Sequence, residues 1–536
     1  MGMKRFLIIY ALIAVAFTSC IENDIPLPVI VPKITSMEVD GATSVVINSD
    51  KRTVNITLNE QTDIKRTNIR SVTFDNKQTT MSWDITGEHD LSNALSVTLS
   101  IYQDYNWTIT ANQPIERYFT VEGQVGASEI DVTNRRVVTY VNGSQSQSNI
   151  KVTSLKLGPK DISTYSPDIV QLKDFTNGQQ VDVTFHGRSE KWNIFIEQTE
   201  TLVEMKSVDA WTGVAWVKAT GIAGQNNGFK YRKQGDSEWI DISGDDVTTN
   251  GGDFSAAIDN LQPLTSYECY AYSGDNQTQT YSFTTEEARQ MPNSSFEIFS
   301  NDESSKYPSF YDPLSTIVEN QTKWWCSGNK GSTTVGSSYA ITTIDESDKM
   351  DGNYSVKLES QYVIVKLAAG NIFVGDFVRV VGTSGGVVNF GRPFTLRPRK
   401  MSLWLKYENG PIDKFNGAPD NDPVKEGDMD RCQVFVAVGD WDYRKYGGSP
   451  DSPVQVNTLE RSTFFNPKGE AVIGYGTYVT DKATNGWIKV EVPIEYTTTS
   501  RKPTHIIVSC AASMLGDYFT GSTKSTLWVD GIELHY

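Results

Sequence analysis

Short apolar runs separated by turn residues fill most of the chain, and apolar positions spaced as on a helix face are rare. In residues 33–123, apolar and polar positions alternate in runs such as Thr53–Leu58 and Ser96–Ile101, which are rich in Val, Ile and Thr. An alternation with a period of two predicts strands with one buried face. Branched side chains of this kind also fit the pleated surface of a sheet. We therefore predict an all-β chain that begins with an immunoglobulin-like sandwich over residues 33–123.

The same pattern recurs in residues 124–201. The segment NIRSVTF at 68–74 is echoed by NIKVTSLKL at 149–157, and VTLSIYQDYNWTI at 97–109 is echoed by VDVTFHGRSEKWNIFI at 181–196. We interpret this as an internal repeat, in which two copies of one immunoglobulin-like fold follow each other. Each copy carries a tryptophan, Trp107 or Trp192. Strand alternation surrounds both, which favours packing in the core over a ligand platform.

Residues 202–287 show a different pattern. They contain Leu261-Gln262-Pro263-Leu264-Thr265-Ser266-Tyr267 ahead of an alternating strand. This run resembles the tyrosine-corner signature of fibronectin type III domains. The resemblance implies that the Tyr267 hydroxyl bonds to the backbone at one end of a sandwich. It also implies a structural spacer without chemistry of its own.

Residues 288–536 follow a polar segment that ends in Pro292, and they read as one large two-sheet sandwich. Several stretches here carry more information than composition: NSSFEIF (293–299), KWWCSGNKG (323–331), FGRPFTLRPRKMSLWLKYENG (390–410), DRCQVFVAVGD (430–440) and GDYFTGSTKSTLWVDGIEL (516–534). In this order they resemble the putative carbohydrate-metabolism domain of Bacteroidetes surface lipoproteins. The resemblance implies a jelly-roll fold and a role in handling polysaccharides, and it assigns no catalytic residue.

Exposed aromatic rings are the candidates for contact with a glycan, because a ring face packs on the C–H side of a sugar. Trp324 and Trp325 are adjacent, so in a strand they point to opposite faces, and a turn follows them. Trp441 and Tyr443 share one strand face or lie in a loop among charged residues. We name these four as ligand candidates, with packing as the alternative. Three more tryptophans lie in alternating strands and are expected in the core: Trp404, Trp487 and Trp528.

Charged residues of this region form three further groups. In jelly-roll glycan binders that resemble this domain, acids on the first and last strands often share a structural calcium. That resemblance makes Glu297 and Asp530 candidate ligands, with ordinary hydrogen bonding as the alternative. The acidic stretch Asp413–Asp430 lacks EF-hand spacing and favours a solvated loop. Three arginines are expected to satisfy carboxylates or loop carbonyls: Arg392, Arg397 and Arg399.

The first 32 residues resemble a targeting and anchoring segment. Lys4 and Arg5 precede an apolar run that is too short to span a bilayer comfortably, and the run ends at Phe17-Thr18-Ser19-Cys20. Residues 1–20 resemble a bacterial lipoprotein signal peptide, which implies lipidation at Cys20, with an ordinary signal peptide as the alternative. Acidic residues behind Cys20 resemble the surface-export signal of Bacteroidetes lipoproteins. Residues 21–32, rich in proline, are expected to form a tether. The implied location is the outer face of the outer membrane.

Composition excludes several classes of function. The net charge of −17 is unsuited to nucleic acid, which needs a basic surface, and it fits a displayed protein with a neutral ligand. The four His show no spacing of a transition-metal site, and no cofactor is required. Beyond Cys20, the cysteines are Cys269, Cys326, Cys432 and Cys510. Buried thiols are the favoured interpretation, and Cys432 with Cys510 is the pair to test for a bridge.

These observations favour a non-catalytic lipoprotein that captures polysaccharide or oligosaccharide through residues 288–536. Outer-membrane transporters or surface enzymes are the expected protein partners. A structural or adhesive surface protein is one alternative, since serial sandwich modules also serve that role. A glycoside hydrolase or lyase is another alternative. A hydrolase needs two carboxylates at a set separation, one with a raised pKa, and the sequence does not pair any.

Overall fold

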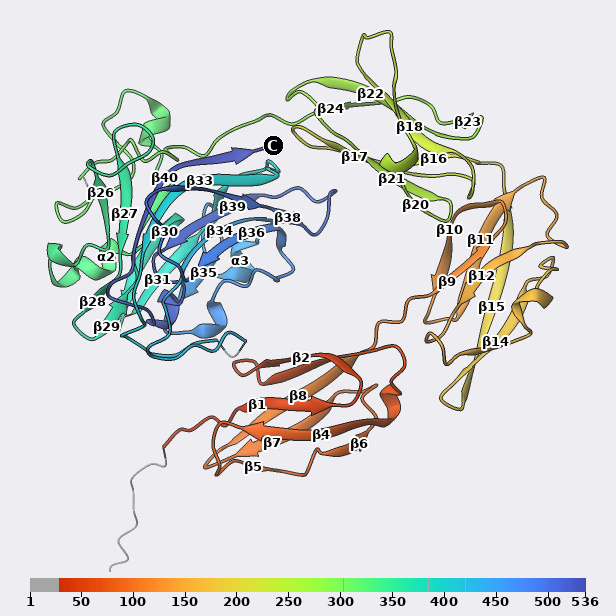
Figure 1. Ribbon diagram of the computed structural model, residues 1–536, viewed down its shortest axis with the longest axis horizontal. Helices are drawn as coiled ribbons and strands as arrows, with labels where there is room; N and C mark the ends of the chain where they lie inside the picture. The colour runs from red at the N-terminus through yellow and green to blue at the C-terminus, as the bar shows by residue number, and fades with distance from the viewer. Residues whose placement is uncertain (1–27, 302, 383–384, 420) are drawn as a thin grey trace, which may run out of the picture. The chain divides into compact units, whose positions relative to one another are not determined.

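The computed structural model describes residues 28–301, 303–382, 385–419 and 421–536 (Figure 1). The predicted signal peptide, Cys20 and most of the tether lie outside this part of the chain. The chain divides into two compact units after Pro114. This boundary is earlier than the predicted one at 123/124, because Phe119 and Val121 belong to the second core. None of the helices in the described ranges is long and apolar enough to cross a membrane.

The first unit is a sandwich of two sheets. One sheet has the order β1–β4–β6 and the other β2–β3–β8–β7–β5. The strands are β1 (Ile34–Val39), β2 (Ala42–Asn48), β3 (Thr53–Leu58), β4 (Thr67–Phe74), β5 (Thr80–Met81), β6 (Gly87–His89), β7 (Leu95–Ser100) and β8 (Asp104–Asn112). Trp107 on β8 is fully buried between the sheets. The predicted core position of this tryptophan is therefore confirmed.

The second module repeats this arrangement. Its sheets have the orders β10–β11–β15–β14–β13 and β12–β9. The strands are β9 (Tyr118–Val121), β10 (Gln124–Asp131), β11 (Arg136–Asn142), β12 (Val152–Lys156), β13 (Thr164–Ser166), β14 (Gln179–Phe185) and β15 (Arg188–Thr199). In both modules a parallel pair lies at the centre of the larger sheet, β3 with β8 and β11 with β15.

Even the register of the two parallel pairs agrees. Thr53, the first residue of β3, faces the residue after Trp107, and Arg136, the first residue of β11, faces the residue after Trp192. Trp192 is also fully buried. The repeated sequence thus specifies one fold twice, as predicted.

The third module pairs the sheets β16–β17–β21–β20 and β19–β18–β22–β23, with β24 on β22. The strands are β16 (Glu204–Ala210), β17 (Ala215–Thr220), β18 (Asn227–Lys233), β19 (Ile240–Ile242), β20 (Thr248–Asn250), β21 (Asp253–Ile258), β22 (Ser266–Ser273), β23 (Asn276–Gln277) and β24 (Tyr281–Thr284). The Tyr267 hydroxyl accepts a hydrogen bond from the Gln262 amide at 3.0 Å. The predicted contact of Tyr267 with the backbone is confirmed.

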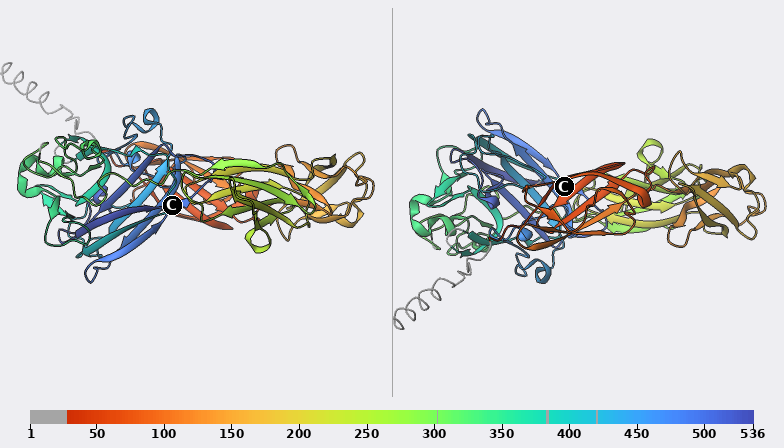
Figure 2. Two further views of the ribbon diagram at one scale, coloured as in Figure 1. Left: turned by 90° about the horizontal axis from the view of Figure 1, so that it is seen from above. Right: turned by 90° about the horizontal axis from the view of Figure 1, so that it is seen from below.

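The last domain is a larger sandwich, whose strands can be followed from two further sides in Figure 2. Its nine-stranded sheet has the order β35–β31–β30–β39–β34–β36–β38, with β25 on β30 and β32 on β39. These strands are β25 (Trp325–Cys326), β30 (Asn371–Val381), β31 (Gly385–Phe390), β32 (Arg392–Pro393), β34 (Cys432–Gly439), β35 (Val454–Asn457), β36 (Val472–Thr480), β38 (Glu495–Tyr496) and β39 (His505–Ala511).

The facing sheet of this domain is smaller, with the order β26–β27–β40–β33–β37, and a separate hairpin joins β28 to β29. The strands are β26 (Thr342–Asp345), β27 (Ser355–Glu359), β28 (Gln361–Val363), β29 (Lys366–Ala368), β33 (Lys400–Glu408), β37 (Ile488–Pro493) and β40 (Thr526–His535). The helices among the described residues are short: α2 (Asn329–Ser332), α3 (Tyr443–Tyr446) and the 3₁₀ turns Ile64–Arg66, Ile169–Gln171, Gly244–Asp246, Val318–Gln321, Thr333–Val335, Ser337–Tyr339, Arg461–Thr463 and Gly516–Tyr518.

One core fills the space between these two sheets, and Cys432 and Cys510 lie in it as free thiols. Alternating residues of β33 and β40, such as Leu405 and Val529, point into it. Trp404 and Trp487 are half-buried and lie outside this core, which corrects the sequence-based expectation, whereas Trp528 is buried as expected, at 8% exposed, but not in this core. Trp528 lies on the other face of the smaller sheet, where Lys406 Nζ is 4.3 Å from its ring centroid. The alternation of these strands was predicted correctly, but its period alone does not say which face of a strand packs against the other sheet.

A compact joint connects the third module to the last domain. Trp211 is 2% exposed, and its indole N–H donates to the Thr499 carbonyl at 2.9 Å. Arg397 lies over the same ring and forms a salt bridge with Glu286 at 2.9 Å. Arg399 pairs with Asp259 at 2.8 Å. The expectation that these arginines satisfy carboxylates and carbonyls is confirmed.

Candidate functional site

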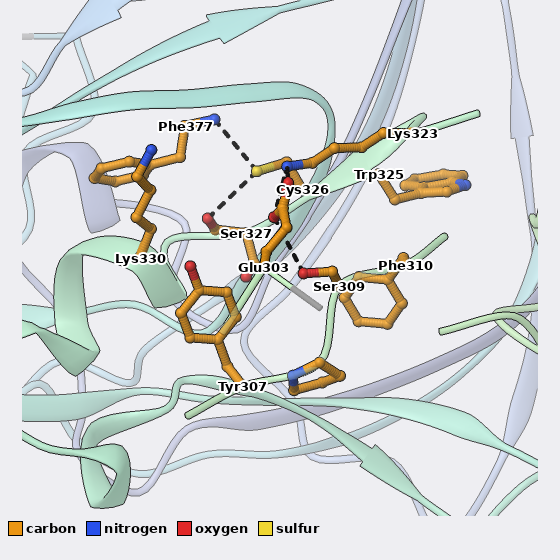
Figure 3. Close-up of a pocket in the computed structure, with 11 residues that line it drawn as sticks. Glu303, Tyr307, Ser309, Phe310, Lys323, Trp325, Cys326, Ser327, Lys330 and Phe377 are labelled. Carbon is orange, nitrogen blue, oxygen red and sulfur yellow. Dashed lines mark hydrogen bonds and ion pairs between the residues drawn. The ribbon is translucent and has the colours of Figure 1, made fainter. Parts of the chain in front are cut away.

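A pocket of about 290 Å³ opens beside the edge of the larger sheet in the last domain (Figure 3). The segment 303–310, the short strand β25, the helix α2 and the strand β30 form its walls. The lining residues are Glu303, Tyr307, Pro308, Ser309, Phe310, Lys323, Trp325, Cys326, Ser327, Lys330 and Phe377. Aromatic rings and polar groups thus face one space, as is typical of small-molecule sites.

Buried Asn329 holds the turn that carries Lys330. Its Nδ2 donates to the Thr342 carbonyl at 2.7 Å, and its Oδ1 accepts from the amides of Ile341 and Thr342 at 2.8 and 3.0 Å. Gly331 lies so close to Phe377 that a Cβ there would be 2.9 Å from the ring. The backbone of α2 is therefore fixed against β30, while the Lys330 side chain is exposed.

A charged pair crosses one wall of the pocket. Lys323 Nζ lies 2.7 Å from Oε1 and 2.9 Å from Oε2 of Glu303. Burial alone would raise the pKa of Glu303, but the hydrogen bond and charge of Lys323, together with the hydrogen bonds from Ser309 and Tyr311, outweigh it and leave the pKa below its ordinary value. The ammonium of Lys323 has a raised pKa, because the contact with Glu303 and the nearby Cys326 outweigh its burial. Both groups are charged at neutral pH.

Cys326 lies next to this pair with its sulfur inside the fold. The Phe377 amide donates to its Sγ at 3.2 Å. Burial raises the pKa of the thiol, and this effect exceeds the opposing one of Lys323. Because the thiolate is the reactive form, Cys326 is a packing group here and not a nucleophile.

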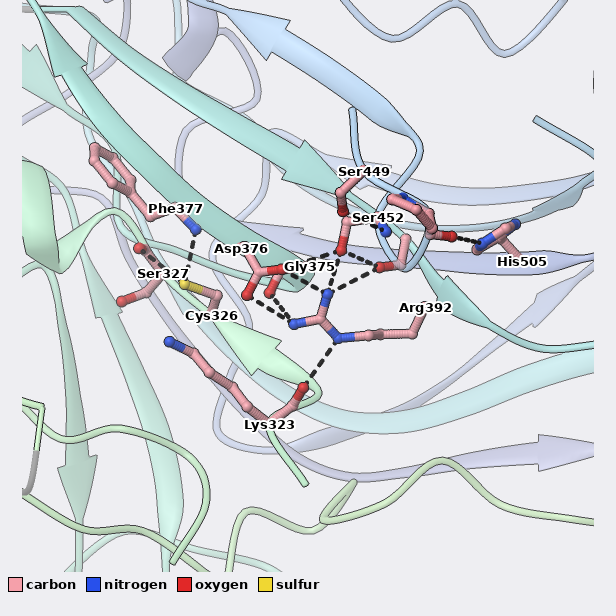
Figure 4. Close-up of polar contacts among 12 residues, drawn as sticks. Lys323, Cys326, Ser327, Gly375, Asp376, Phe377, Arg392, Ser449, Ser452 and His505 are labelled. Carbon is pink, nitrogen blue, oxygen red and sulfur yellow. Dashed lines mark hydrogen bonds and ion pairs between the residues drawn. The ribbon is translucent and has the colours of Figure 1, made fainter. Parts of the chain in front are cut away.

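Behind the pocket, the buried guanidinium of Arg392 pairs with the half-buried carboxylate of Asp376 (Figure 4). The two guanidinium N–H groups reach the two carboxylate oxygens at 2.8 and 2.9 Å, and Ser452 bonds to both partners. Burial alone would raise the pKa of Asp376, but the hydrogen bonds from Arg392 lower it. Arg392 Nε also donates to the Lys323 carbonyl at 2.9 Å. This network therefore positions the strand that supplies Lys323 and Cys326.

The outer face of the larger sheet carries an aromatic surface that continues from the pocket. Cys326 and Phe377 pack against this second apolar cluster. Within it, the Phe435 and Phe465 rings are stacked, with centroids 5.3 Å apart and planes 8° apart. Tyr475 lies 6.0 Å from Phe435. We call the half-buried rings of Phe377, Phe464, Phe465 and Tyr475, with Phe435 beneath them, the aromatic surface.

The four predicted glycan contacts are divided by the structure. Trp325 is fully buried, and its indole N–H donates to the Pro292 carbonyl at 3.0 Å, so its ring face is closed to a ligand although it borders the pocket. Trp324 is half-buried and packs against the core. Trp441 is 5% exposed within the second apolar cluster, and Tyr443 is a half-buried residue at the start of α3.

Glu297 and Asp530 anchor the same loop. The Glu297 carboxylate accepts from the amides of Asn353 and Tyr354, at 2.9 and 3.1 Å for Oε1. Asp530 Oδ2 accepts from the amides of Met350 and Asp351, both at 2.8 Å. Asp530 is fully buried, and its Oδ1 has no hydrogen-bond partner among the described residues.

That free oxygen is compatible with a hard cation such as calcium. The part of the chain that the structure describes holds no group of three or more His, Cys, Asp or Glu side chains suited to a metal ion. Backbone or amide oxygens would therefore have to supply further ligands, and Glu297 is already occupied by amide donors. Calcium remains a prediction that the geometry at Asp530 fits.

Other carboxyl groups have raised pKa values. Asp430 is 3% exposed and accepts from the hydroxyls of Ser513 and Ser525 at 2.6 and 2.7 Å. Burial is the main cause of its raised pKa. The prediction of a solvated loop at 413–430 is therefore wrong for Asp430, the last residue of this stretch. Asp517 is half-buried, and burial raises its pKa to about 6.

The polar part of the pocket was not predicted from the sequence. The stretch KWWCSGNKG contains Lys323, Cys326 and Lys330, but only its two tryptophans were predicted to contact a ligand, because aromatic rings were the criterion. Tyr307 and Phe377 carried no local signal. They come from segments distant in sequence, and only the tertiary fold brings them to one space.

Comparisons with known proteins identify the type of the last domain. Residues 295–535 match the model of a family described as "Putative carbohydrate metabolism domain". The resemblance drawn from the C-terminal motifs is thereby confirmed for this domain. No curated protein matches the chain.

Three solved structures resemble the fold. A putative glycoside hydrolase from Bacteroides thetaiotaomicron is 13% identical, with 95% of this chain and 98% of that chain covered and a TM-score of 0.30. One from Bacteroides vulgatus is 19% identical, with 45% and 96% covered and a TM-score of 0.33. A carbohydrate-binding module specific for non-crystalline cellulose is 11% identical, with 40% and 88% covered and a TM-score of 0.19. These scores are too low to bear on what this chain does.

Proposed function

We propose that this protein binds carbohydrate without cleaving it, through the pocket and the aromatic surface of its last domain. The observation that carries the proposal is the match of residues 295–535 to a carbohydrate-related family. The geometry supports it, because the pocket combines rings with polar groups and continues into further rings on the same sheet face. Sugars are held by this combination of ring faces and hydrogen bonds.

The non-catalytic part of the proposal rests on the two carboxylates beside the pocket. Glycoside hydrolysis needs one carboxyl group that keeps its proton. The hydrogen bonds from Lys323 and Arg392 instead hold the pKa values of Glu303 and Asp376 below their ordinary values. Neither group is suited to act as the general acid at neutral pH.

The location and the partners of the protein belong to the same proposal. Lipidation of Cys20 would hold the protein in the outer membrane, facing outward. The three preceding modules would serve as spacers. An outer-membrane transporter or surface enzymes would then be the partners that receive the captured glycan.

The test measures binding of the full chain to a broad glycan array, together with release of reducing ends from each ligand found. We expect binding without release. Phe465→Ala removes a half-buried ring of the aromatic surface and should weaken binding. Trp404→Ala, on the opposite sheet, is the matched control and should leave binding unchanged. Absence of binding to every polysaccharide class would overturn the proposal.

A second candidate function is glycoside hydrolysis, and Asp517 is the observation that favours it. The pKa of this carboxyl is raised to about 6 by burial, and the ring of the next residue, Tyr518, lies 5.1 Å from Phe464 of the aromatic surface. As a general acid it would have to be protonated, so activity would fall as the pH rises through about 6. Asp517→Asn would abolish release of reducing ends, and the exposed Asp481→Asn would not.

A further inference from the structure

Both carboxylates beside the pocket are already engaged with donors of the protein. Glu303 accepts from Lys323 through both oxygens, from Ser309 at 3.1 Å and from Tyr311 at 3.3 Å. Asp376 accepts from Arg392 through both oxygens and from Ser452 at 3.1 Å. Because a carboxylate takes about four hydrogen bonds, Glu303, the carboxylate that lines the pocket, would have to give up one of these donors to accept from a ligand hydroxyl.

The groups that are not yet used are donors. Among the described residues, neither Lys330 Nζ nor the Tyr307 hydroxyl has a hydrogen-bond or ion-pair partner. Figure 3 shows both side chains reaching toward the same space, which Cys326 borders from the far side. Burial raises the pKa of Tyr307, so the phenol keeps its proton and its ability to donate.

The charge of the lining departs from that of the whole protein. The chain has a net charge of −17. The described lining residues include a single acid, Glu303, against two lysines, Lys323 and Lys330. Because Glu303 and Lys323 neutralise each other, the positive charge of Lys330 has no local counterpart among these residues.

We infer that the pocket takes a sugar residue that carries a carboxylate, a uronic acid, and that Lys330 and Tyr307 donate to that carboxylate. This inference rests on the proposed function and names its substrate class. Neutral sugar hydroxyls both donate and accept, and they are matched best by sites that also offer acceptors. A carboxylate only accepts, and its hydrogen bond with an ammonium group is strengthened by charge. The expectation of a neutral ligand, drawn from net charge, is thereby revised.

The backbone of the turn that carries Lys330 is held in place before a ligand binds. Asn329 holds the backbone through buried hydrogen bonds, and the close approach of Gly331 to Phe377 sets its distance from β30. Only the lysine side chain has to be ordered on binding, which limits the entropic cost to that of one long side chain. The half-buried Phe377 ring lies beside it and offers an apolar contact for the sugar.

The test compares three forms of each ligand on the full chain. Uronic-acid oligosaccharides of several backbones are measured beside their methyl esters and their carboxyl-reduced, neutral counterparts. We expect the acidic form to bind at least about tenfold more tightly than the other two. Lys330→Gln and Tyr307→Phe should each remove most of that preference. Lys482→Gln changes an exposed lysine elsewhere in the domain and should leave the preference intact.

Salt provides a second readout that a change in packing would not imitate. Binding of the acidic form should weaken as salt is added, and Lys330→Gln should reduce this dependence. Equal binding of acid, ester and neutral forms would overturn the inference and leave the proposed function standing. Preference for neutral glycans would do the same. No binding to any glycan would overturn both.

Discussion

The ring centroids of Trp211 and Tyr496 lie 4.5 Å apart, although the two residues belong to different domains. Trp211 precedes β17 of the third module, and Tyr496 ends β38 of the last domain. The Tyr496 hydroxyl donates to the Pro398 carbonyl at 2.8 Å, and this hydrogen bond fixes the position of the Tyr496 ring. The contact therefore ties the third module to the carbohydrate-related domain through buried rings.

We predict that Trp211→Ala uncouples these two domains. Truncation of a buried tryptophan costs about 3–5 kcal/mol, and here the ring contacts with Tyr496 and Arg397 lie across the joint. In calorimetry, the wild-type third and last domains should unfold in one transition, and the variant should show two. Trp239→Ala, which removes a ring packed against Tyr270 inside the third module, is the control and should lower only that module's midpoint.

The two ion pairs at the joint should differ sharply in their contributions to the free energy of unfolding. The side chains of Arg397 and Glu286 are 6% and 9% exposed, whereas those of Arg399 and Asp259 are 50% and 45% exposed. Loss of one partner of a buried pair costs about 3–5 kcal/mol when the other charge stays buried alone. Here Lys502 Nζ also lies 3.0 Å from Glu286, so we expect the loss at the lower end of this range. Exposed pairs contribute about 0–1 kcal/mol. Urea unfolding of Arg397→Ala and Arg399→Ala should separate the two cases, and equal losses would contradict the assignment.

Acid should weaken the smaller sheet of the last domain through Asp345. Burial alone would raise the pKa of this carboxyl, but hydrogen bonds from Ser347 and from the Trp528 indole lower it to about 2. A lowered pKa in the folded state means that the stabilisation is present above about pH 4 and is lost as the pH falls toward 2. Asp345→Asn should flatten the profile of stability against pH in this range. The measurement is unfolding at each pH, followed by tryptophan fluorescence.

Asp481→Asn, at an exposed position in the same domain, is the matched control for this profile. Its pH dependence between 4 and 2 should follow that of the wild type. A wild-type profile that is flat across this range would show that Asp345 does not contribute as described.

Calcium should raise the stability of the last domain if it binds at Asp530. The buried, partnerless Oδ1 provides one hard oxygen ligand, and its carboxyl group has a pKa raised mainly by burial. A bound cation would favour the ionised form and stabilise the fold by mass action. We expect a thermal midpoint that rises with millimolar calcium and returns after chelation. Asp530→Asn should abolish the response, and an unresponsive wild type would rule out the site.

The sequence was informative wherever the signal was local. Alternation and branched residues predicted strands, and the echo of residues 97–109 in 181–196 predicted the repeat that the matching order and register of β3, β8, β11 and β15 confirm. The spacing that ends in Tyr267 predicted its contact with the backbone. In each case a few neighbouring residues specify the geometry, because turn chemistry and strand periodicity act over short distances.

Sequence by itself determined an all-β chain of serial sandwiches and the carbohydrate-related character of its last domain. The tertiary structure alone decided which face of a strand is covered, so Trp528 lies outside the core under Lys406 while Trp325 lies inside it. It also decided that Tyr307, Lys330 and Phe377 share one pocket. The physical reason is that alternation sets the period of a strand, whereas burial and proximity depend on which distant segment packs against it.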